Sequence, residues 1–128
     1  MRPEDLTASA WAALKEKPEL AIKKAQACID RYEDEAIEQQ DAITAAPPVG
    51  KVTPDQKASI SANWALNNVG TCYYIQGKAF AKLGRFDKAQ KAYEKAQHYS
   101  YARTWDLNWE GFFWSPAEGA SNELVYLR

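Results

Sequence analysis

The stretch GKAFAKLGRFDKAQKAYEKA, residues 77–96, decides the expected fold. Gly77 and Ala89 each precede an aromatic residue, Phe80 and Tyr93, at helical spacing, and Gly84 lies between the two halves. Small residues let two antiparallel backbones approach closely, and the aromatic rings fill the space that remains between them. A glycine between two helical patterns is typical of a turn. The stretch therefore predicts two packed antiparallel helices.

These offsets resemble the tetratricopeptide repeat, a helix–turn–helix unit of about 34 residues. Aligning Gly77 with the family pattern begins the unit at Gly70 and ends it near residue 103. The chain departs from the pattern at Gln76, where leucine is usual, and at Tyr101, where the closing proline is expected. The missing proline predicts that the second helix runs on or bends into the next segment. The resemblance assigns to packing between the helices Tyr73, Gly77, Phe80, Gly84, Phe86, Ala89, Tyr93 and Ala96.

Outside this unit the sequence also indicates helices, because strand-like alternation is nearly absent. The expected fold class is all-α, with tetratricopeptide-like antiparallel hairpins in an α–α superhelix, a Trp-rich capping segment and a short terminal helix. Such units need about three repeats to close a core, so extra helices, the aromatic tail or a second copy must complete it. A single domain, 1–128, would comprise a divergent helical hairpin (4–45), a linker (46–54), the repeat-like hairpin (55–103), and the aromatic cap with the terminal helix (104–128).

Proline and hydroxyl residues mark where helices begin. Pro3 and Pro18 suit the first turns of helices expected over 4–16 and 18–43. TPDQ at 53–56 and SPAE at 115–118 each pair a hydroxyl cap with a side chain three residues later. The first cap predicts one long helix over roughly 55–83, and the second predicts the short terminal helix.

The tryptophan-rich stretch WDLNWEGFFWSP, residues 105–116, is expected to cover the end of the repeat. Bare repeat ends expose apolar surface, which proteins avoid by capping. A helical reading places Asp106 and Glu110 one turn apart at the edge of the lid, which would pack mainly on the two repeat helices. An alternative is an exposed platform for sugars. The residues assigned to the hydrophobic cap are Trp105, Trp109, Phe112, Phe113 and Trp114, with Trp105 and Trp109 expected to be largely buried.

The resemblance also implies where a partner binds, because repeat proteins of this family bind peptides in the groove lined by the first helix of each unit. A polar stripe on the first helix here has spacings of 4, 4, 3, 4 and 4. A solvated face is the alternative interpretation. The expected partner-binding residues, off the buried face, are Asn63, Asn67, Thr71, Tyr74, Lys78 and Lys82.

The sequence offers little for catalysis. His98 is the single histidine, and neither a metal-ligand spacing nor a phosphate-binding glycine loop occurs, so we expect no enzyme activity, no catalytic residues, no metal and no cofactor. A net charge of −1 argues against nucleic-acid and membrane partners. Cys28 and Cys72 fit reduced core thiols of a cytoplasmic protein.

The expected function is therefore a non-enzymatic scaffold or interaction module that binds a protein or peptide whose identity the sequence does not give. Two alternatives stay open. One is a carbohydrate-binding or carbohydrate-active accessory protein that uses a tryptophan platform, and the other is a structural subunit of a homo-oligomer.

Overall fold

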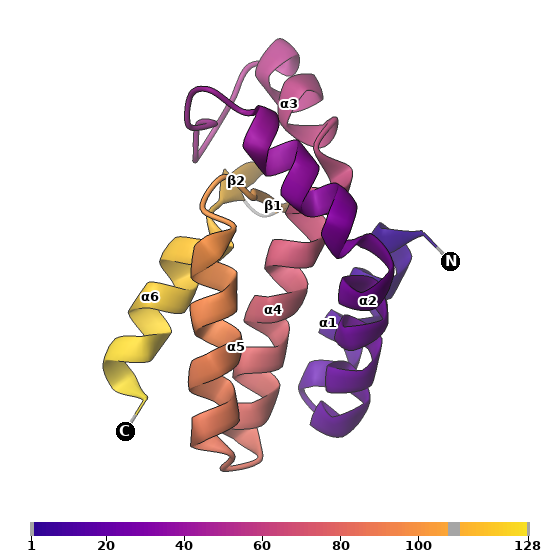
Figure 1. The fold of residues 1–128 in the computed structure, drawn as a ribbon, viewed down its shortest axis with the longest axis vertical. Coiled ribbons are helices and arrows are strands. Elements are labelled where there is room, and N and C mark those ends of the chain that lie inside the picture. The colour runs from indigo at the N-terminus through magenta and orange to yellow at the C-terminus, as the bar shows by residue number, and fades with distance from the viewer. Residues whose placement is uncertain (1, 108–110, 128) are drawn as a thin grey trace.

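The structure, a computed structural model, describes residues 2–107 and 111–127. Within these residues the chain is a packed bundle of six helices with one two-stranded hairpin (Figure 1). The helical part of the expected fold is confirmed, whereas the strands were not expected. The helices are α1 (Pro3–Leu14), α2 (Pro18–Ala42), α3 (Pro54–Ser61), α4 (Trp64–Lys82), α5 (Phe86–His98) and α6 (Pro116–Tyr126), and the strands are β1 (Thr104–Asp106) and β2 (Phe112–Trp114).

Helices α1 and α2 begin as the sequence predicts, with Pro3 and Pro18 in their first turns. Proline suits this position because its missing N–H would have no partner inside the helix. Both helices pack on α4, which they cover from the right in the view of Figure 1. The residues that they bury include Leu6, Ala10, Leu14, Ala21, Ala25, Cys28, Ile29 and Ala36.

The prediction of one long helix over 55–83 is wrong, because the structure divides this stretch into α3 and α4 at residues 62–63. Helix α3 begins at Thr53 with the predicted capping box, in which the side chains of Thr53 and Gln56 each accept the other residue's backbone N–H. Asn63 then leaves the helical conformation with ψ of 50°. Gln39 on α2 accepts the N–H of Leu66 at 2.9 Å, so a tertiary contact satisfies one donor freed at the new helix start.

Helix α4 is the centre of the bundle. It contacts α1, α2, α5 and α6 (Figure 1), and most of its own residues are buried. A helix that is buried all round does not show a simple division into a polar and an apolar stripe. This position matters for the expected partner-binding stripe, which lies on the same helix.

Helices α4 and α5 pack closely against each other in an antiparallel hairpin, as the sequence predicts. Gly84 turns the chain with φ of +73°, a conformation that favours glycine. A Cβ atom added at Gly77 would overlap the ring of Tyr93, which is 1% exposed. Ala89 and Ala96 are fully buried, and Phe80 is half-buried.

Gly84 lies exposed in the turn, where an added Cβ atom would meet nothing within 4 Å, so it does not pack between the helices. Phe86 is a second exception among the residues assigned to packing in this hairpin. It is the first residue of α5 and 48% exposed, so the expectation that it seals the hairpin is wrong.

A carboxylate connects α2 to α4 and to the end of α5. Oε2 of Glu33 accepts the hydroxyls of both Tyr73 and Tyr99, each at 2.6 Å, and the two tyrosine rings stack with centroids 5.8 Å apart. Burial, and then the hydrogen bond to Glu33, raise the pKa of both phenols well above the usual value. The phenols therefore stay protonated and continue to donate.

Replacing Glu33 with Ala is expected to lower the free energy of unfolding by about 2 kcal/mol, because two buried tyrosines lose the charged acceptor of their hydroxyl groups. Urea unfolding followed by circular dichroism measures the loss. Asp34→Ala is the matched control, because Asp34 follows Glu33 on the same helix and its side chain is exposed. An equal loss in both variants would show that the two hydrogen bonds contribute nothing specific.

The tryptophan-rich segment forms a hairpin instead of the expected helix. β1 and β2 pair antiparallel, with Trp105 opposite Phe113, and Gly111 closes the loop with φ of +92°. A Cβ atom added at Gly111 would overlap the ring of Trp105, so the turn needs glycine for space as well as for conformation. Gly50 of the linker bridges Phe113 on the other side of β2.

The hairpin covers the bundle, but not where the sequence indicated. Trp114 contacts Trp11 of α1 and Tyr74 of α4, with ring centroids 6.3 and 5.2 Å apart, instead of packing mainly on α4 and α5. Phe113 is buried, but Trp105 is only half-buried, as are Phe112 and Asp106. Trp109 and Glu110 lie outside the described residues.

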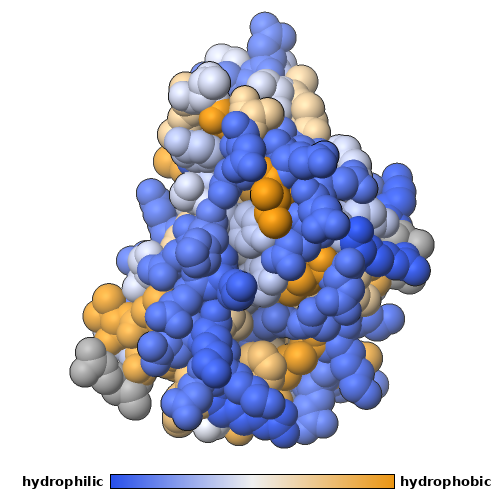
Figure 2. All heavy atoms as spheres, viewed as in Figure 1, coloured by the Kyte–Doolittle hydropathy of each residue, from blue (hydrophilic) through white to orange (hydrophobic). Residues whose placement is uncertain are grey.

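Helix α6 begins as predicted, because the Ser115 hydroxyl accepts the N–H of Glu118 at 3.2 Å. It packs on α4 and α5, and Glu123 pairs with Lys78 at 3.2 Å. The last turn is exposed, with Val125 69% exposed. Figure 2 shows a mostly hydrophilic face with a hydrophobic cluster at the lower left, where Figure 1 places the end of α6.

Candidate functional site

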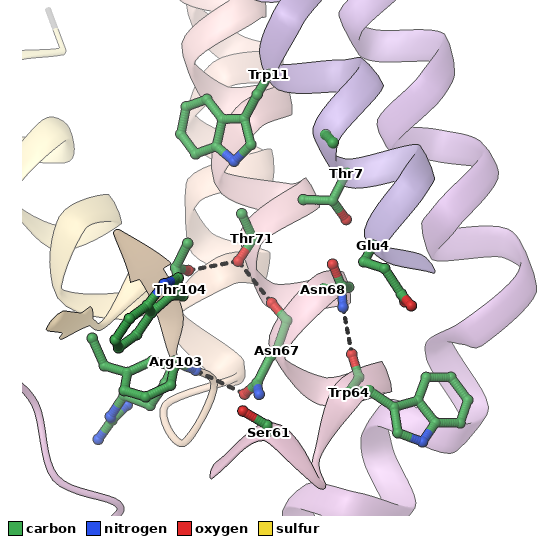
Figure 3. A pocket seen from close by; sticks show the side chains of 13 residues that line it. Glu4, Thr7, Trp11, Ser61, Trp64, Asn67, Asn68, Thr71, Arg103 and Thr104 are labelled. Carbon is green, nitrogen blue, oxygen red and sulfur yellow. Dashed lines mark hydrogen bonds between the residues drawn. The ribbon is translucent and has the colours of Figure 1, made fainter. Parts of the chain in front are cut away.

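An open cavity of about 430 Å³ lies between α1, the first turns of α4 and the hairpin. Figure 3 shows side chains from all three elements pointing toward this space. It is the candidate site because it combines aromatic walls with small polar side chains, as ligand pockets do. Its lining residues are Glu4, Thr7, Ala8, Trp11, Ser61, Trp64, Asn67, Asn68, Thr71, Arg103, Thr104, Trp105 and Phe113.

Two of the three tryptophans in the cavity wall are held from behind by other rings. Trp11 packs against Tyr74, with centroids 6.1 Å apart. Trp64 and Tyr32 pack in a T-shaped arrangement with ring centroids 5.7 Å apart, and Trp64 is 39% exposed. Such packing fixes the rings before any ligand arrives, which lowers the entropy cost of binding.

Trp105 forms the wall on the hairpin side. Its ring meets Phe113 edge-on at 4.9 Å, and the ammonium of Lys57 lies 4.1 Å from its centroid. A cation at this distance over an indole ring is attracted by the ring's quadrupole. Lys57 thus connects α3 to the rim of the cavity.

The polar residues on the α4 side divide into two groups. Asn67 is committed to the fold, because its Nδ2 donates to the carbonyl of Ile60 and its Oδ1 accepts the N–H of Arg103, both at 2.9 Å. Thr71 is committed as well, through the carbonyl of Asn67 at 2.7 Å and the hydroxyl of Thr104 at 2.6 Å (Figure 3).

The second group is available. Nδ2 of Asn68 donates to the carbonyl of Trp64 at 2.8 Å, while its Oδ1 accepts no hydrogen bond from any residue that the structure describes. The hydroxyl of Ser61 is likewise unpaired within the described chain. These oxygen atoms can accept from, and Ser61 can donate to, a molecule in the cavity.

The guanidinium of Arg103 is not available to a ligand. It donates to four backbone carbonyls, those of Pro47, Pro48, Ser100 and Ala102, at 2.7 to 3.3 Å. Burial lowers the pKa of this group. It attaches the linker to the start of the hairpin, and Arg103 is one of the residues that line the cavity.

Two thiols lie behind the cavity wall. The hydroxyl of Thr7 is 3.3 Å from Sγ of Cys72 and 3.9 Å from Sγ of Cys28, and both cysteines are buried and free of a disulfide. The hydrogen bond to Cys28, together with burial, raises the pKa of Cys72. A protonated and buried thiol is a poor nucleophile, so Cys72 acts in packing. The hydrogen bond with Cys72 lowers the pKa of Cys28, whose thiol is also buried.

The structure divides the expected partner-binding stripe. Asn67 and Thr71 line the cavity, but Thr71 is 2% exposed and Tyr74 is 9% exposed, so the expectation that they lie off the buried face is wrong.

The other residues of the stripe do not line the cavity. Lys78 is half-buried beside α6 and bonded to Glu123. The two ends of the stripe lie away from the cavity lining, Asn63 half-buried at the start of α4 and Lys82 exposed at its end. The cause is the central position of α4, whose polar stripe faces α1, α6 and the hairpin.

Trp11, Trp64 and Asn68 are not among the site residues expected from the sequence. One signal was present: Trp11 and Trp64 are large aromatic residues that the repeat pattern does not require, and Asn68 follows another asparagine in a helix. Asparagine is a poor helix former, so two in succession indicate a role other than helix formation.

Over residues 2–107 and 111–127, no group of three or more His, Cys, Asp or Glu side chains is placed to hold a metal ion. Among the helices of this part of the chain, none combines the length and the apolar character that crossing a bilayer requires. A scan against protein-family models and searches of the curated proteins and of the solved structures found no match to this chain.

Proposed function

We propose that this chain is a non-enzymatic, tetratricopeptide-like interaction module that binds a short peptide segment of a partner protein in the cavity between α1, α4 and the hairpin. The observation that carries the proposal is the set of side chains at the cavity. Ordered indole rings stand beside the unused oxygen atoms of Asn68 and Ser61. Aromatic rings supply apolar contact and amide or hydroxyl groups supply hydrogen bonds to a peptide backbone. The close α4–α5 hairpin supports the family assignment within this proposal.

The character of the cavity also favours binding over catalysis. Arg103 is bonded to carbonyl groups, and Glu4 forms an ion pair with Arg2 at 3.4 Å. The cavity therefore presents mainly neutral polar groups. Neutral donors and acceptors between aromatic walls bind a ligand without providing a general base or a nucleophile.

The test is a library of displayed dodecapeptides selected against the intact protein, with the tightest peptide then synthesised as the probe. Trp64→Ala is expected to weaken probe binding at least tenfold, roughly the cost of an aromatic contact residue. Phe86→Ala is the matched control, because it also removes an exposed aromatic ring but lies outside the cavity. Titration calorimetry measures both affinities, and circular dichroism confirms that both variants are folded.

Equal affinity in the two variants would place the peptide elsewhere and overturn the proposal. Three tryptophans at one cavity are also compatible with a sugar platform, so the same proteins are titrated with a panel of oligosaccharides. Binding of an oligosaccharide that depends on Trp64, with no peptide selected, would replace the peptide by a carbohydrate ligand.

A further inference from the structure

The small sheet uses its backbone hydrogen bonds in a pattern that leaves one edge open. The N–H and carbonyl of Phe113 both bond to Gly50, at 2.9 and 2.7 Å. These groups of Phe113 therefore point away from β1. Antiparallel strands alternate between pairs that share hydrogen bonds and pairs that do not. Trp105, which lies opposite Phe113, must belong to a pair without mutual hydrogen bonds.

It follows that the N–H and carbonyl of Trp105 point away from β2, toward the outer edge of β1. The pairing leaves both groups without a bond to β2, and neither bonds to the backbone of a residue outside the strands among residues 2–107 and 111–127. One donor and one acceptor therefore stand side by side on this edge. An unpaired strand edge of this kind is a template for pairing with another chain.

The open edge borders the candidate cavity. Along an extended chain, residues two apart direct their backbone groups to the same side. The N–H of Arg103, two residues before Trp105, is accepted by Oδ1 of Asn67 on α4. Asn67 therefore lies on the outer side of β1. It lines the cavity with Arg103 and Thr104 (Figure 3), and Trp105 lines it as well.

We propose that the cavity takes its peptide as an added β-strand on the free edge of β1. This inference rests on the proposed function and specifies how the peptide binds. One peptide residue accepts the N–H of Trp105 and donates its own N–H to the carbonyl of Trp105. The sheet would then run from the linker at Gly50 through β2 and β1 to the peptide. The partner is an extended segment without proline at the pairing residue, because proline has no N–H to donate.

The chain contains two precedents for this pairing. At the opposite edge of the same sheet, a single residue, Gly50, already pairs with Phe113 through two hydrogen bonds. At the preceding position of the open edge, Asn67 supplies a side-chain oxygen where a strand would supply a carbonyl. The peptide would continue this row from Asn67 along β1.

The first experiment is an N-methyl scan of the probe peptide selected for the proposed function. Each backbone N–H of the probe is replaced in turn by N-methyl, and the affinity for the intact protein is measured. Strand addition predicts an alternating pattern, because successive N–H groups face opposite sides. Methylation at the residue opposite Trp105 should weaken binding at least about tenfold, through one lost hydrogen bond and the added bulk. Methylation of its two neighbours should change binding less than about threefold, because their N–H groups make no bond to β1.

The second experiment observes the protein. Amide hydrogen exchange of Trp105, measured by NMR, should slow at least tenfold when the probe is added, whereas the amide of Phe113, already bonded to Gly50, should not change. Trp105→Pro removes the ring and the N–H, and Trp105→Ala removes the ring alone. The proline variant should bind the probe at least tenfold more weakly than the alanine variant. If the proline variant does not fold, the N-methyl scan and the exchange of Trp105 in the natural chain decide.

The outcomes separate the two proposals. Probe binding that depends on Trp64 but shows no alternation in the scan, or leaves the exchange of Trp105 unchanged, overturns strand addition and keeps the peptide site. Probe binding that does not depend on Trp64 overturns the peptide site, and strand addition falls with it.

Discussion

Replacing Tyr93 with Ala is expected to lower the free energy of unfolding by about 3–5 kcal/mol, the usual cost of removing a buried aromatic side chain. The ring is 1% exposed, packs directly on Gly77, and has its centroid 5.9 Å from that of Tyr74. Because Gly77 has no side chain, it cannot fill the space that the ring leaves. Urea unfolding of the intact chain, followed by circular dichroism, measures the loss.

Phe86→Ala is the control for this prediction. Both residues are aromatic, both lie on α5, and the repeat pattern assigned both to packing, yet Phe86 is 48% exposed. Its removal should change the free energy of unfolding by no more than about 0.5 kcal/mol. Similar losses in the two variants would mean that α5 is rotated relative to the structure described above.

The α4–α5 hairpin could be predicted from sequence because its determinants are local. Gly77, Gly84, Ala89 and Tyr93 lie within 17 residues. Close approach of two helices requires small residues at fixed offsets, so the packing leaves a direct record in the sequence. The helix starts at Thr53 and Ser115 were predictable for the same reason, since the capping bonds span only three residues.

Two other elements depend on contacts that no local pattern contains. The break between α3 and α4 places Leu66 where Gln39 of α2 accepts its N–H. The β-hairpin is supported on one side by Gly50, from a linker more than 50 residues earlier in the chain. In the sequence, the spacing of Asp106 and Glu110 is compatible with one turn of helix, whereas the structure pairs Trp105 with Phe113 across two strands. Strand formation of this kind depends on the neighbouring strands more than on local propensity.

The candidate site shows the same division. Asn67 and Thr71 were selected from the sequence, and both line the cavity, but their polar groups are used inside the fold. The walls come from Trp11 and Trp64, on segments that meet only in the folded bundle. Spacing on one helix identifies which residues share a face, but it does not identify which other helix covers that face.

Tyr74 illustrates this most clearly. On sequence alone it belongs to a polar stripe, and its replacement should hardly affect stability. In the structure its ring contacts Trp11, Tyr93 and Trp114, with centroids 6.1, 5.9 and 5.2 Å apart. These rings come from α1, α5 and β2, so Tyr74 joins three elements to α4. Burial raises its pKa, which keeps the hydroxyl protonated within this cluster.

Tyr74→Ala is therefore expected to lower the free energy of unfolding by about 3–5 kcal/mol. Lys82→Ala is the control from the same stripe, because its side chain is exposed, and it should change the free energy by no more than about 0.5 kcal/mol. Aromatic pairs contribute about 0.5–1.5 kcal/mol beyond their buried area, so Tyr74→Ala and Trp114→Ala should also be non-additive in a double-mutant cycle. Urea unfolding of the four proteins measures that coupling. A nearly unchanged stability of Tyr74→Ala would return this residue to the exposed face that the sequence indicated, and the contacts of the hairpin with α1 and α4 would then be wrong.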